Sequence, residues 1–278
     1  MNMPIHAERE TPEEILVLDK VGISFGGLRA VDNLSFRIRR GEVVGLIGPN
    51  GAGKTTVFNL ITSIYTPTDG DVKWKGMRIS GQSPDRIAAL GIRRTFQSVR
   101  LFSDMTVLEN VAAGAHLSVK QRWWQGLLNT PAQRSEERQL KERAYAMLER
   151  MNLTRVALEN ATSLPYGTQR RIELARTLIA NPELIILDEP AAGLNDNESA
   201  ELNESIRSIQ KDGIAVLLVE HDMNVVMAVT DHIVVINFGK KIAEGAPDEI
   251  RSNPQVIEAY LGQDDDVPVA ENSTGAVR

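Results

Sequence analysis

The chain has 278 residues, of which 42% are hydrophobic and 24% are charged, proportions that are ordinary for a globular protein. Its formal net charge of −6 argues against nonspecific binding to nucleic acid, for which a basic surface is expected. The absence of cysteine excludes disulfides, thiol catalysis and cysteine-ligated metals, and no apolar run reaches the roughly 20 residues that a membrane helix needs.

The first third of the chain predicts strands and two short helices. Two segments that alternate between apolar and polar residues are separated by Gly26-Gly27 and predict antiparallel strands. A short apolar run that ends at a glycine predicts a buried strand, and a helix over 53–64 follows it. Ser83-Pro84 begins a short helix that Gly91 ends. The expected strands are Ile15–Phe25, Val31–Ile38, Glu42–Ile47 and Val72–Ile79.

The middle of the chain is predicted to be mostly helical. Thr106 and Glu109 have the spacing of a capping box, in which each side chain bonds to the backbone at a helix start. Residues 118–134 are expected to be irregular. Apolar residues then recur at helical spacing, and a further helix ends near Asn181. The residues at helical spacing are Leu140, Ala144, Met147, Leu148 and Met151.

The last third predicts strands that alternate with helices. Apolar runs at 184–187, 215–219 and 233–236 indicate buried strands, and Phe238-Gly239 indicates a hairpin. This alternation is typical of a parallel sheet covered on both faces. We therefore expect one α/β domain over 13–262, with an N-terminal antiparallel β region and an inserted helical subdomain at about 98–181. The acidic, polar residues 263–278 predict a disordered tail.

The stretch GPNGAGKTT matches the phosphate-binding loop (P-loop). It follows an apolar strand and precedes a helix, and this context distinguishes it from an ordinary glycine-rich turn. The glycines let backbone N–H groups point at phosphate oxygens, and the helix start adds a positive dipole end. Lys54 is expected to reach the β- and γ-phosphates of a nucleotide, and Thr55 to bind Mg²⁺. The expected nucleotide-binding residues are Gly48, Pro49, Asn50, Gly51, Ala52, Gly53, Lys54, Thr55 and Thr56.

Two further motifs lie at the ends of predicted strands. In LIILDEP (184–190), the strand places Asp188 near the phosphate loop, because ligands bind outside the carboxyl ends of parallel strands. Asp188 is expected to hold Mg²⁺ through water and Glu189 to act on an attacking water molecule; the alternative is a strand end with solvated acids. His221 follows the strand 215–219 at the same edge, where it either contacts the γ-phosphate or has a structural role.

The order of these motifs resembles that of the nucleotide-binding subunit of an ATP-binding-cassette (ABC) transporter. The phosphate loop, LPYGTQRR (164–171), LIILDEP and VEHD occur in the family's order, and the resemblance covers about residues 15–262. It implies a P-loop NTPase fold that hydrolyses ATP with Mg²⁺ to drive solute transport.

The resemblance also implies roles for individual residues. Phe25 stands where the family has an aromatic that stacks on adenine. Gln97, in RTFQ, matches the glutamine that contacts Mg²⁺ and the attacking water and senses the membrane partner. Glu189 matches the catalytic carboxylate, Asp188 the metal-side aspartate and His221 the switch histidine. The loop AAGLND (191–196) resembles one that crosses a dimer interface.

LPYGTQRR could by itself be an ordinary turn before an amphipathic helix or part of a phosphate site. It stands where the family has Leu-Ser-Gly-Gly-Gln, a signature loop that contacts the γ-phosphate held by the opposite subunit. Pro165 replaces the serine and thereby removes a hydroxyl and a backbone N–H. We expect the amides of Tyr166, Gly167 and Thr168, at a helix start, to make the phosphate contact. The alternative is a degenerate, inactive signature.

Several stretches resemble a narrower branch, the longer of the two ATPases of branched-chain amino-acid importers. They are RTFQSVRLF, the segment around Trp123-Trp124, YGTQRRIELAR, DEPAAGLN, VEHDMNVVM and NPQVIEAYLG. The branch implies pairing with a second, different ATPase, a homodimer being the alternative. It also implies two integral membrane permease subunits, an indirect link to a solute-binding protein, and a peripheral position on the cytoplasmic face of the inner membrane.

Other functions stay open at this stage. Importers for urea, short amides or other amino acids have similar ATPases, and the solute does not touch this chain. A soluble ABC-type ATPase for DNA repair or translation usually has long coiled-coil insertions or two cassettes. This chain has a single cassette and an acidic net charge, which argue against a nucleic-acid partner. The intact Lys54, Asp188, Glu189 and His221 disfavour an inactive nucleotide sensor.

Overall fold

The computed structural model describes residues 13–95, 98–115 and 131–261, with side chains described except at 131–134 and 261. It has two sheets. The first is antiparallel, with strands in the order β2-β1-β4-β5. Its strands are β1 (Glu14–Phe25), β2 (Leu28–Arg39), β4 (Asp69–Trp74) and β5 (Met77–Arg78). The expected single strand over 72–79 is wrong, because Lys75 and Gly76 both adopt positive φ and turn the chain into the β4–β5 hairpin.

The second sheet has the order β10-β9-β3-β8-β7-β6. Its first five members in the chain are parallel, and β10 pairs antiparallel with β9, so the expected parallel sheet and late hairpin are confirmed. The strands are β3 (Val43–Ile47), β6 (Ile92–Arg94), β7 (Leu184–Asp188), β8 (Ala215–Val219), β9 (His232–Asn237) and β10 (Lys240–Gly245). Strand β6 was not expected, since two of its three residues are arginines.

The helices connect and cover these strands. They are α1 (Lys54–Ile61), α2 (Pro84–Ala89), α3 (Val107–Ala113), α4 (Pro131–Arg150), α5 (Tyr166–Leu178), α6 (Asp196–Lys211), α7 (Met223–Val229), α8 (Pro247–Arg251) and α9 (Pro254–Leu261), with 3-10 turns at Thr154–Val156 and Ala161–Ser163. The capping box at Thr106 and Glu109 is present at the start of α3. Helix α4 begins at Pro131, so the expectation of irregular structure is wrong for 131–134.

The central strands β3, β7 and β8 of the second sheet are almost entirely apolar because both faces of the sheet are covered there. In β7, Leu184 and Ile186 pack with α1 and the antiparallel sheet, whereas Ile185 and Leu187 pack with α3, α5 and α6. The same alternation continues in β8. Every residue of β3, β7 and β8 is buried, and burial of this kind stabilises the fold by about 25 cal/mol per Å² of apolar surface.

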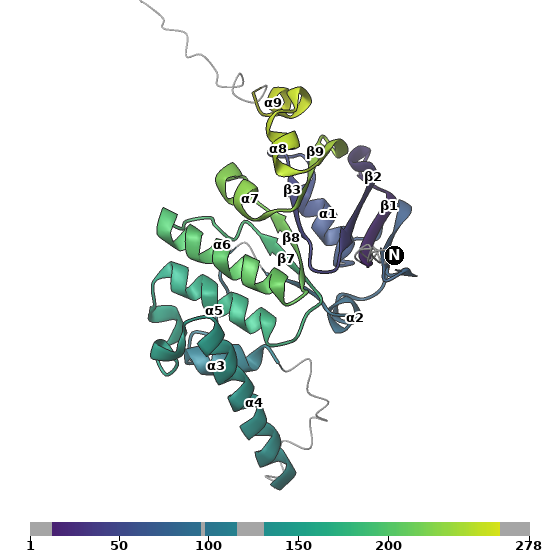
Figure 1. Ribbon diagram of the computed structural model, residues 1–278. Coiled ribbons are helices and arrows are strands. Elements are labelled where there is room, and N and C mark those ends of the chain that lie inside the picture. The colour runs from purple at the N-terminus through teal and green to yellow at the C-terminus, as the bar shows by residue number, and fades with distance from the viewer. Residues whose placement is uncertain (1–12, 96–97, 116–130, 262–278) are drawn as a thin grey trace, which may run out of the picture.

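The helices α3 and α4 lie at one end of the molecule, and α8 and α9 lie at the other (Figure 1). Helix α3 packs against α4 and α5, and the face of α4 that carries Ala144 and Leu148 is buried in the same cluster as α5. The limits of a helical subdomain at about 98–181, and of the domain at 13–262, stay predictions. Within the described part of the chain, no helix combines the length and apolarity needed to cross a membrane.

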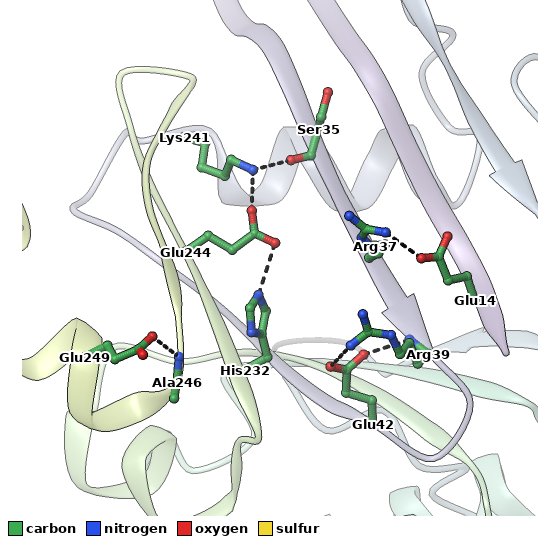
Figure 2. A network of polar contacts seen from close by, with 10 residues as sticks. All are labelled: Glu14, Ser35, Arg37, Arg39, Glu42, His232, Lys241, Glu244, Ala246 and Glu249. Atoms are coloured by element: carbon green, nitrogen blue, oxygen red, sulfur yellow. Dashed lines mark hydrogen bonds and ion pairs between the residues drawn. The ribbon is translucent and has the colours of Figure 1, made fainter. Parts of the chain in front are cut away.

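Polar contacts fix the antiparallel sheet beside the β9–β10 hairpin (Figure 2). Lys241 donates to the backbone carbonyl of Ser35 in β2, 2.7 Å away, and also pairs with Glu244. Glu244 in turn accepts a contact from His232 Nε2 at 3.0 Å. The turn at Phe238-Gly239 is bonded to β2 directly, where the N–H of Asp32 donates to the carbonyl of Gly239 at 2.9 Å, and this turn and the end of β1 border one cavity.

Candidate functional site

The phosphate loop connects β3 to α1, as expected. Gly48 has φ 154°, and a Cβ there would lie 2.0 Å from the carbonyl oxygen of Ile236 in β9. Only glycine therefore fits between the two backbones. The loop is braced from the other side, where the N–H of Gly239 donates to the carbonyl of Ala52 at 2.9 Å. The described first turn of α1 carries no acidic side chain, so the positive end of its dipole is not neutralised there.

Lys54 lies folded over the phosphate loop. Its Nζ donates to the carbonyl oxygens of Gly48 at 2.6 Å and Pro49 at 3.0 Å. Burial lowers the pKa of Lys54, and the nearby Glu189 and Asp188 carboxylates partly oppose this effect. The ammonium group is thus held between the loop and the two acids that the sequence assigns to the same site.

A cavity of about 480 Å³ opens beside the loop. It is lined by Phe25, Leu28, Arg29, Ala30, Asn50, Gly51, Ala52, Gly53, Lys54, Thr55, Thr56, Glu189 and Phe238. Phe25 is 42% exposed, and its ring contacts that of Tyr65 edge-on with centroids 5.1 Å apart. The cavity is therefore apolar and aromatic at one end and formed by backbone N–H groups and Lys54 at the other, which suits a nucleoside phosphate.

Asp188 stands at the end of β7, at the same sheet edge as the loop. Its carboxylate is bound by Arg94, whose Nη2 lies 2.8 Å from Asp188 Oδ2. Arg94 comes from β6, and its other nitrogen donates to Asn59 Oδ1 at 2.8 Å. The sequence analysis did not predict this ion pair. Its one sequence signal is that a charged residue, Arg94, ends the short strand β6.

Glu189 follows Asp188 in an unusual backbone conformation. Its φ of 46° lies in the left-handed region, where a residue with a side chain is strained by about 1 kcal/mol or more. Its N–H donates to the carbonyl of Val219 in β8 at 2.8 Å. The side chain borders the cavity, and its Oε1 lies 3.9 Å from His221 Nδ1. The expected closeness of the two groups is therefore observed, although His221 is 64% exposed.

Glu220 is a functional candidate that the sequence analysis did not single out. It is buried, its Oε1 accepts from the N–H of Ala191 at 2.6 Å, and its Oε2 accepts from the N–H of His221 at 3.2 Å. Burial raises the pKa of Glu220, and these backbone hydrogen bonds oppose the shift. One side chain thus fixes the segments on both sides of the Glu189–His221 contact.

The signature loop does not line the cavity of its own chain. Tyr166, Gly167 and Thr168 form the first turn of α5, after Pro165 at the N-cap position, where no side chain caps the helix. They pack instead against the segment that follows Glu189: a Cβ at Gly167 would lie 2.3 Å from Glu198 Oε1. Tyr166 is 40% exposed. Gly167 is buried beneath it and Thr168 is partly buried, so the start of α5 reaches the surface through Tyr166, away from the chain's own phosphate loop.

Four expectations fall wholly or partly outside the described residues, among them the disordered tail at 263–278 and the irregular structure expected over 118–130. Gln97, expected to contact metal and water, lies in the gap at 96–97, and Trp123-Trp124 lies in the gap at 116–130. The structure says nothing about these residues.

The residues present fit a nucleotide with Mg²⁺. Thr55 supplies a hydroxyl and Asp188 a carboxylate, the oxygen ligands that Mg²⁺ prefers, and the described residues contain no group of three or more acids, histidines or cysteines arranged to hold a metal ion by themselves. A magnesium ion here would take its other ligands from phosphate and water, as is usual at nucleotide sites.

Comparison with known proteins gives matches along nearly the whole chain. A family model described as ABC transporter matches residues 31–192, and one described as branched-chain amino acid ATP-binding cassette transporter matches residues 240–266. The chain is 46% identical over 252 residues to the high-affinity branched-chain amino acid transport ATP-binding protein LivG of Salmonella typhimurium, covering 90% of this chain and 99% of the relative. It is 46% identical over 250 residues to BraF of Pseudomonas aeruginosa, covering 90% and 98%.

Solved structures give the same result. The ADP conformation of an ATP-binding cassette of an ABC transporter superimposes with a TM-score of 0.78 at 31% identity, covering 90% of this chain and 99% of that one. A nucleotide-free ATP-binding cassette gives 0.77 at 31% identity, covering 89% and 98%.

Proposed function

Because the chain belongs to the ABC transporter family as one of its ATP-binding cassettes, we propose that it is the ATP-hydrolysing motor of an importer for branched-chain amino acids. The observation that carries the proposal is the convergence of Lys54 and Glu189 on one cavity, with Asp188 close to Lys54 at the same edge. The solute class is supported by the relatives' printed names and by the match of residues 240–266. Importers for urea, short amides or other amino acids are the alternative.

The cavity suggests how ATP lies in it. We place the adenine against Phe25 and the phosphates over the loop, where the N–H groups of residues 50–56 and the ammonium of Lys54 meet their charge. Thr55 and Asp188, with Gln97, would hold Mg²⁺. When bound, Mg²⁺ neutralises charge on the β- and γ-phosphate oxygens. Lys54 Nζ donates two of its three N–H groups to the carbonyls of Gly48 and Pro49 and would turn toward those oxygens when ATP binds.

Hydrolysis needs an oriented water more than it needs covalent chemistry from the protein. Glu189 is the group at the cavity that can accept a proton from that water, and its backbone is fixed through Val219. His221 is placed to steady the Glu189 carboxylate and the leaving phosphate. Both roles are proposals that a change of one side chain can test.

The signature loop lies outside the chain's own cavity and its Tyr166 is exposed, which supports a site shared between two cassettes. We propose that two cassettes pair head to tail, so that the amides at the start of α5 meet the γ-phosphate bound by the mate. A solved relative with a TM-score of 0.69 and 25% identity is a dimer bound to ADP and phosphate. The mate is proposed to be a second, different ATPase. The pair would act on two membrane permeases at the cytoplasmic face, and indirectly on a solute-binding protein.

Transport by the assembled complex tests this proposal. We expect the chain, copurified with its permeases and companion ATPase and reconstituted in proteoliposomes, to support ATP-dependent uptake of leucine but not of urea. Glu189→Gln should nearly abolish turnover, leaving a small measurable rate, while ATP still binds and the cassettes stay dimeric. Uptake of urea instead of leucine would overturn the solute class, and copurification with ribosomes or nucleic acid in place of permeases would overturn the transport role.

A further inference from the structure

A buried arginine joins the start of α5 to the backbone of Glu189. Arg170 lies on the second turn of α5 and is 5% exposed. Its Nη1 lies 2.8 Å from Glu173 Oε2, and its Nη2 donates to the carbonyl oxygen of Glu189 at 3.2 Å. Its guanidinium also lies over the ring of Tyr166, 5.8 Å from the centroid. One side chain thus touches the signature loop and the proposed catalytic residue.

The partner of Arg170 is itself buried. The side chains of Arg170 and Glu173 are 4% and 2% exposed, and both lie among apolar residues of α5. Burial raises the pKa of Glu173, while Arg170, Arg176 and the backbone N–H of Arg100 favour its charged form. A buried ion pair adds little stability compared with apolar residues of the same size. Stability alone therefore does not account for charges at these two positions.

The contact with Glu189 falls at a strained place. The residue has a left-handed φ of 46°, and its peptide groups are fixed on both sides. Its N–H donates to Val219, and its carbonyl accepts from Arg170 and from the N–H of Ala192 at 3.2 Å. A change at either peptide group would turn the carboxylate away from the cavity and from His221. The planar guanidinium can hold this carbonyl, pair with Glu173 and cover Tyr166 at the same time, which an ammonium group cannot do.

We propose that Arg170 is a positioning residue that keeps the Glu189 carboxylate aimed into the cavity and makes its aim depend on the start of α5. This rests on the proposed function, in which that helix start contacts the nucleotide of the mate while Glu189 serves the chain's own nucleotide. Arg170 then carries the state of one ATP site to the other. A displacement of Tyr166 moves the guanidinium, and the guanidinium moves the carbonyl of Glu189.

The test uses Arg170→Lys in the purified complex. Lysine keeps the charge that Glu173 needs but gives up the second bond, so we expect the turnover number to fall at least tenfold while the KM for ATP changes less than twofold. Arg207→Lys is the control for the loss of an arginine that makes two contacts at once, although the Arg207 side chain is 39% exposed. Arg207 also joins an acid, Asp231, to a backbone carbonyl, that of Ala228, and it does so outside the proposed site. It should keep wild-type turnover.

A double-mutant cycle separates positioning from general damage. In a Glu189→Gln background, Arg170→Lys should lower the residual turnover no further, because its effect passes through the carboxylate. A further fall would contradict the proposal. If Arg170→Lys folds poorly, the double variant Arg170→Met/Glu173→Leu takes its place, because it removes both buried charges together. Its turnover number should still be at least tenfold below that of the wild type.

Two outcomes distinguish the proposals. Wild-type turnover in Glu189→Gln would overturn the assignment of Glu189 itself. The role of Arg170 alone would be overturned if Glu189→Gln lost turnover but Arg170→Lys kept it. Where Arg170→Lys does not fold, wild-type turnover in the double variant Arg170→Met/Glu173→Leu would have the same meaning.

Discussion

The guanidinium of Arg94 and the carboxylate of Asp188 lie 2.8 Å apart, although 94 residues separate them in the sequence. Pairing of β6 with β7 brings them together, since Arg94 is opposite Ile186, two residues before Asp188. Arg94 also lies over the ring of Phe58 in α1, 5.2 Å from the centroid. The proposed metal-side carboxylate is thus tied to the helix that follows the phosphate loop.

Arg94→Gln should destabilise the chain in the absence of nucleotide. The side chains of Arg94 and Asp188 are only 17% and 12% exposed, so loss of the cation leaves a nearly buried carboxylate without its charged partner, at a cost of about 2 kcal/mol. Mg²⁺ bound with ATP would replace the lost positive charge. We therefore expect MgATP to raise the melting temperature of Arg94→Gln more than that of the wild type. Equal shifts in the two proteins would show that Asp188 does not face the metal.

Gly48→Ala should remove nucleotide binding and lower stability by several kcal/mol. The added Cβ would lie 2.0 Å from the carbonyl oxygen of Ile236, so the loop or β9 must move. Gly76→Ala is the control, because Gly76 also has a positive φ but nothing lies within 4 Å of its Cβ position. Gly76→Ala should lower the free energy of unfolding only by the strain of a left-handed backbone, about 1 kcal/mol. Urea unfolding and nucleotide titration measure both effects, and equal costs would contradict the steric argument.

The sequence predicts those parts of the site that depend on neighbouring residues. The phosphate loop, the strand ending at Asp188 and the closeness of Glu189 to His221 follow from local motifs and from the meeting of parallel strands at one edge. The β4–β5 turn needs positive φ at both Lys75 and Gly76, and although glycine favours a turn, lysine beside it gives little turn signal.

Contacts between distant segments were missed for a different reason. Strand β6 pairs with β7 and has a single apolar residue, Ile92, in the core, so its sequence gives no sign that Arg94 meets Asp188. The contacts of Arg170 with Glu189 and of Glu220 with Ala191 join residues 19 and 29 positions apart. No spacing rule predicts such pairs, because the packing of α5 and β8 against β7 determines them.

The network around Glu244 should make stability depend on pH (Figure 2). Burial alone would raise the pKa of Glu244, but hydrogen bonds from Lys241 and His232 outweigh it and hold the pKa below the ordinary value of 4.5. A carboxyl with a lowered pKa in the folded state contributes stability above pH 4.5 that is lost as the pH falls through the folded pKa. Glu244→Gln should thus cost about 1 kcal/mol at pH 7 and progressively less below pH 4.5.

Urea unfolding of the wild type and of Glu244→Gln measures this difference. The measurements should run from about pH 7 to about pH 3.5, which covers most of the range in which carboxylates titrate. The exposed Glu258 is the matched control, and its change to Gln should alter stability little at any pH. A cost for Glu244→Gln that stays constant over the whole range would show that its bonds do not depend on the charge.

Pro165→Ser tests how the signature loop contacts phosphate. Pro165 is the N-cap of α5, and no side chain caps the first turn of the helix. A serine there would accept a hydrogen bond from an amide of that turn and stabilise the helix by about 1 kcal/mol. If the amides of Tyr166, Gly167 and Thr168 bind the phosphate of the mate, a serine hydroxyl adds little to this contact and competes for one donor. We therefore expect turnover in the reconstituted complex to stay within about threefold of wild type, a difference of under 1 kcal/mol in the barrier, while the melting temperature rises. A many-fold increase in turnover would mean that the hydroxyl, and not the backbone, is the group this site lacks.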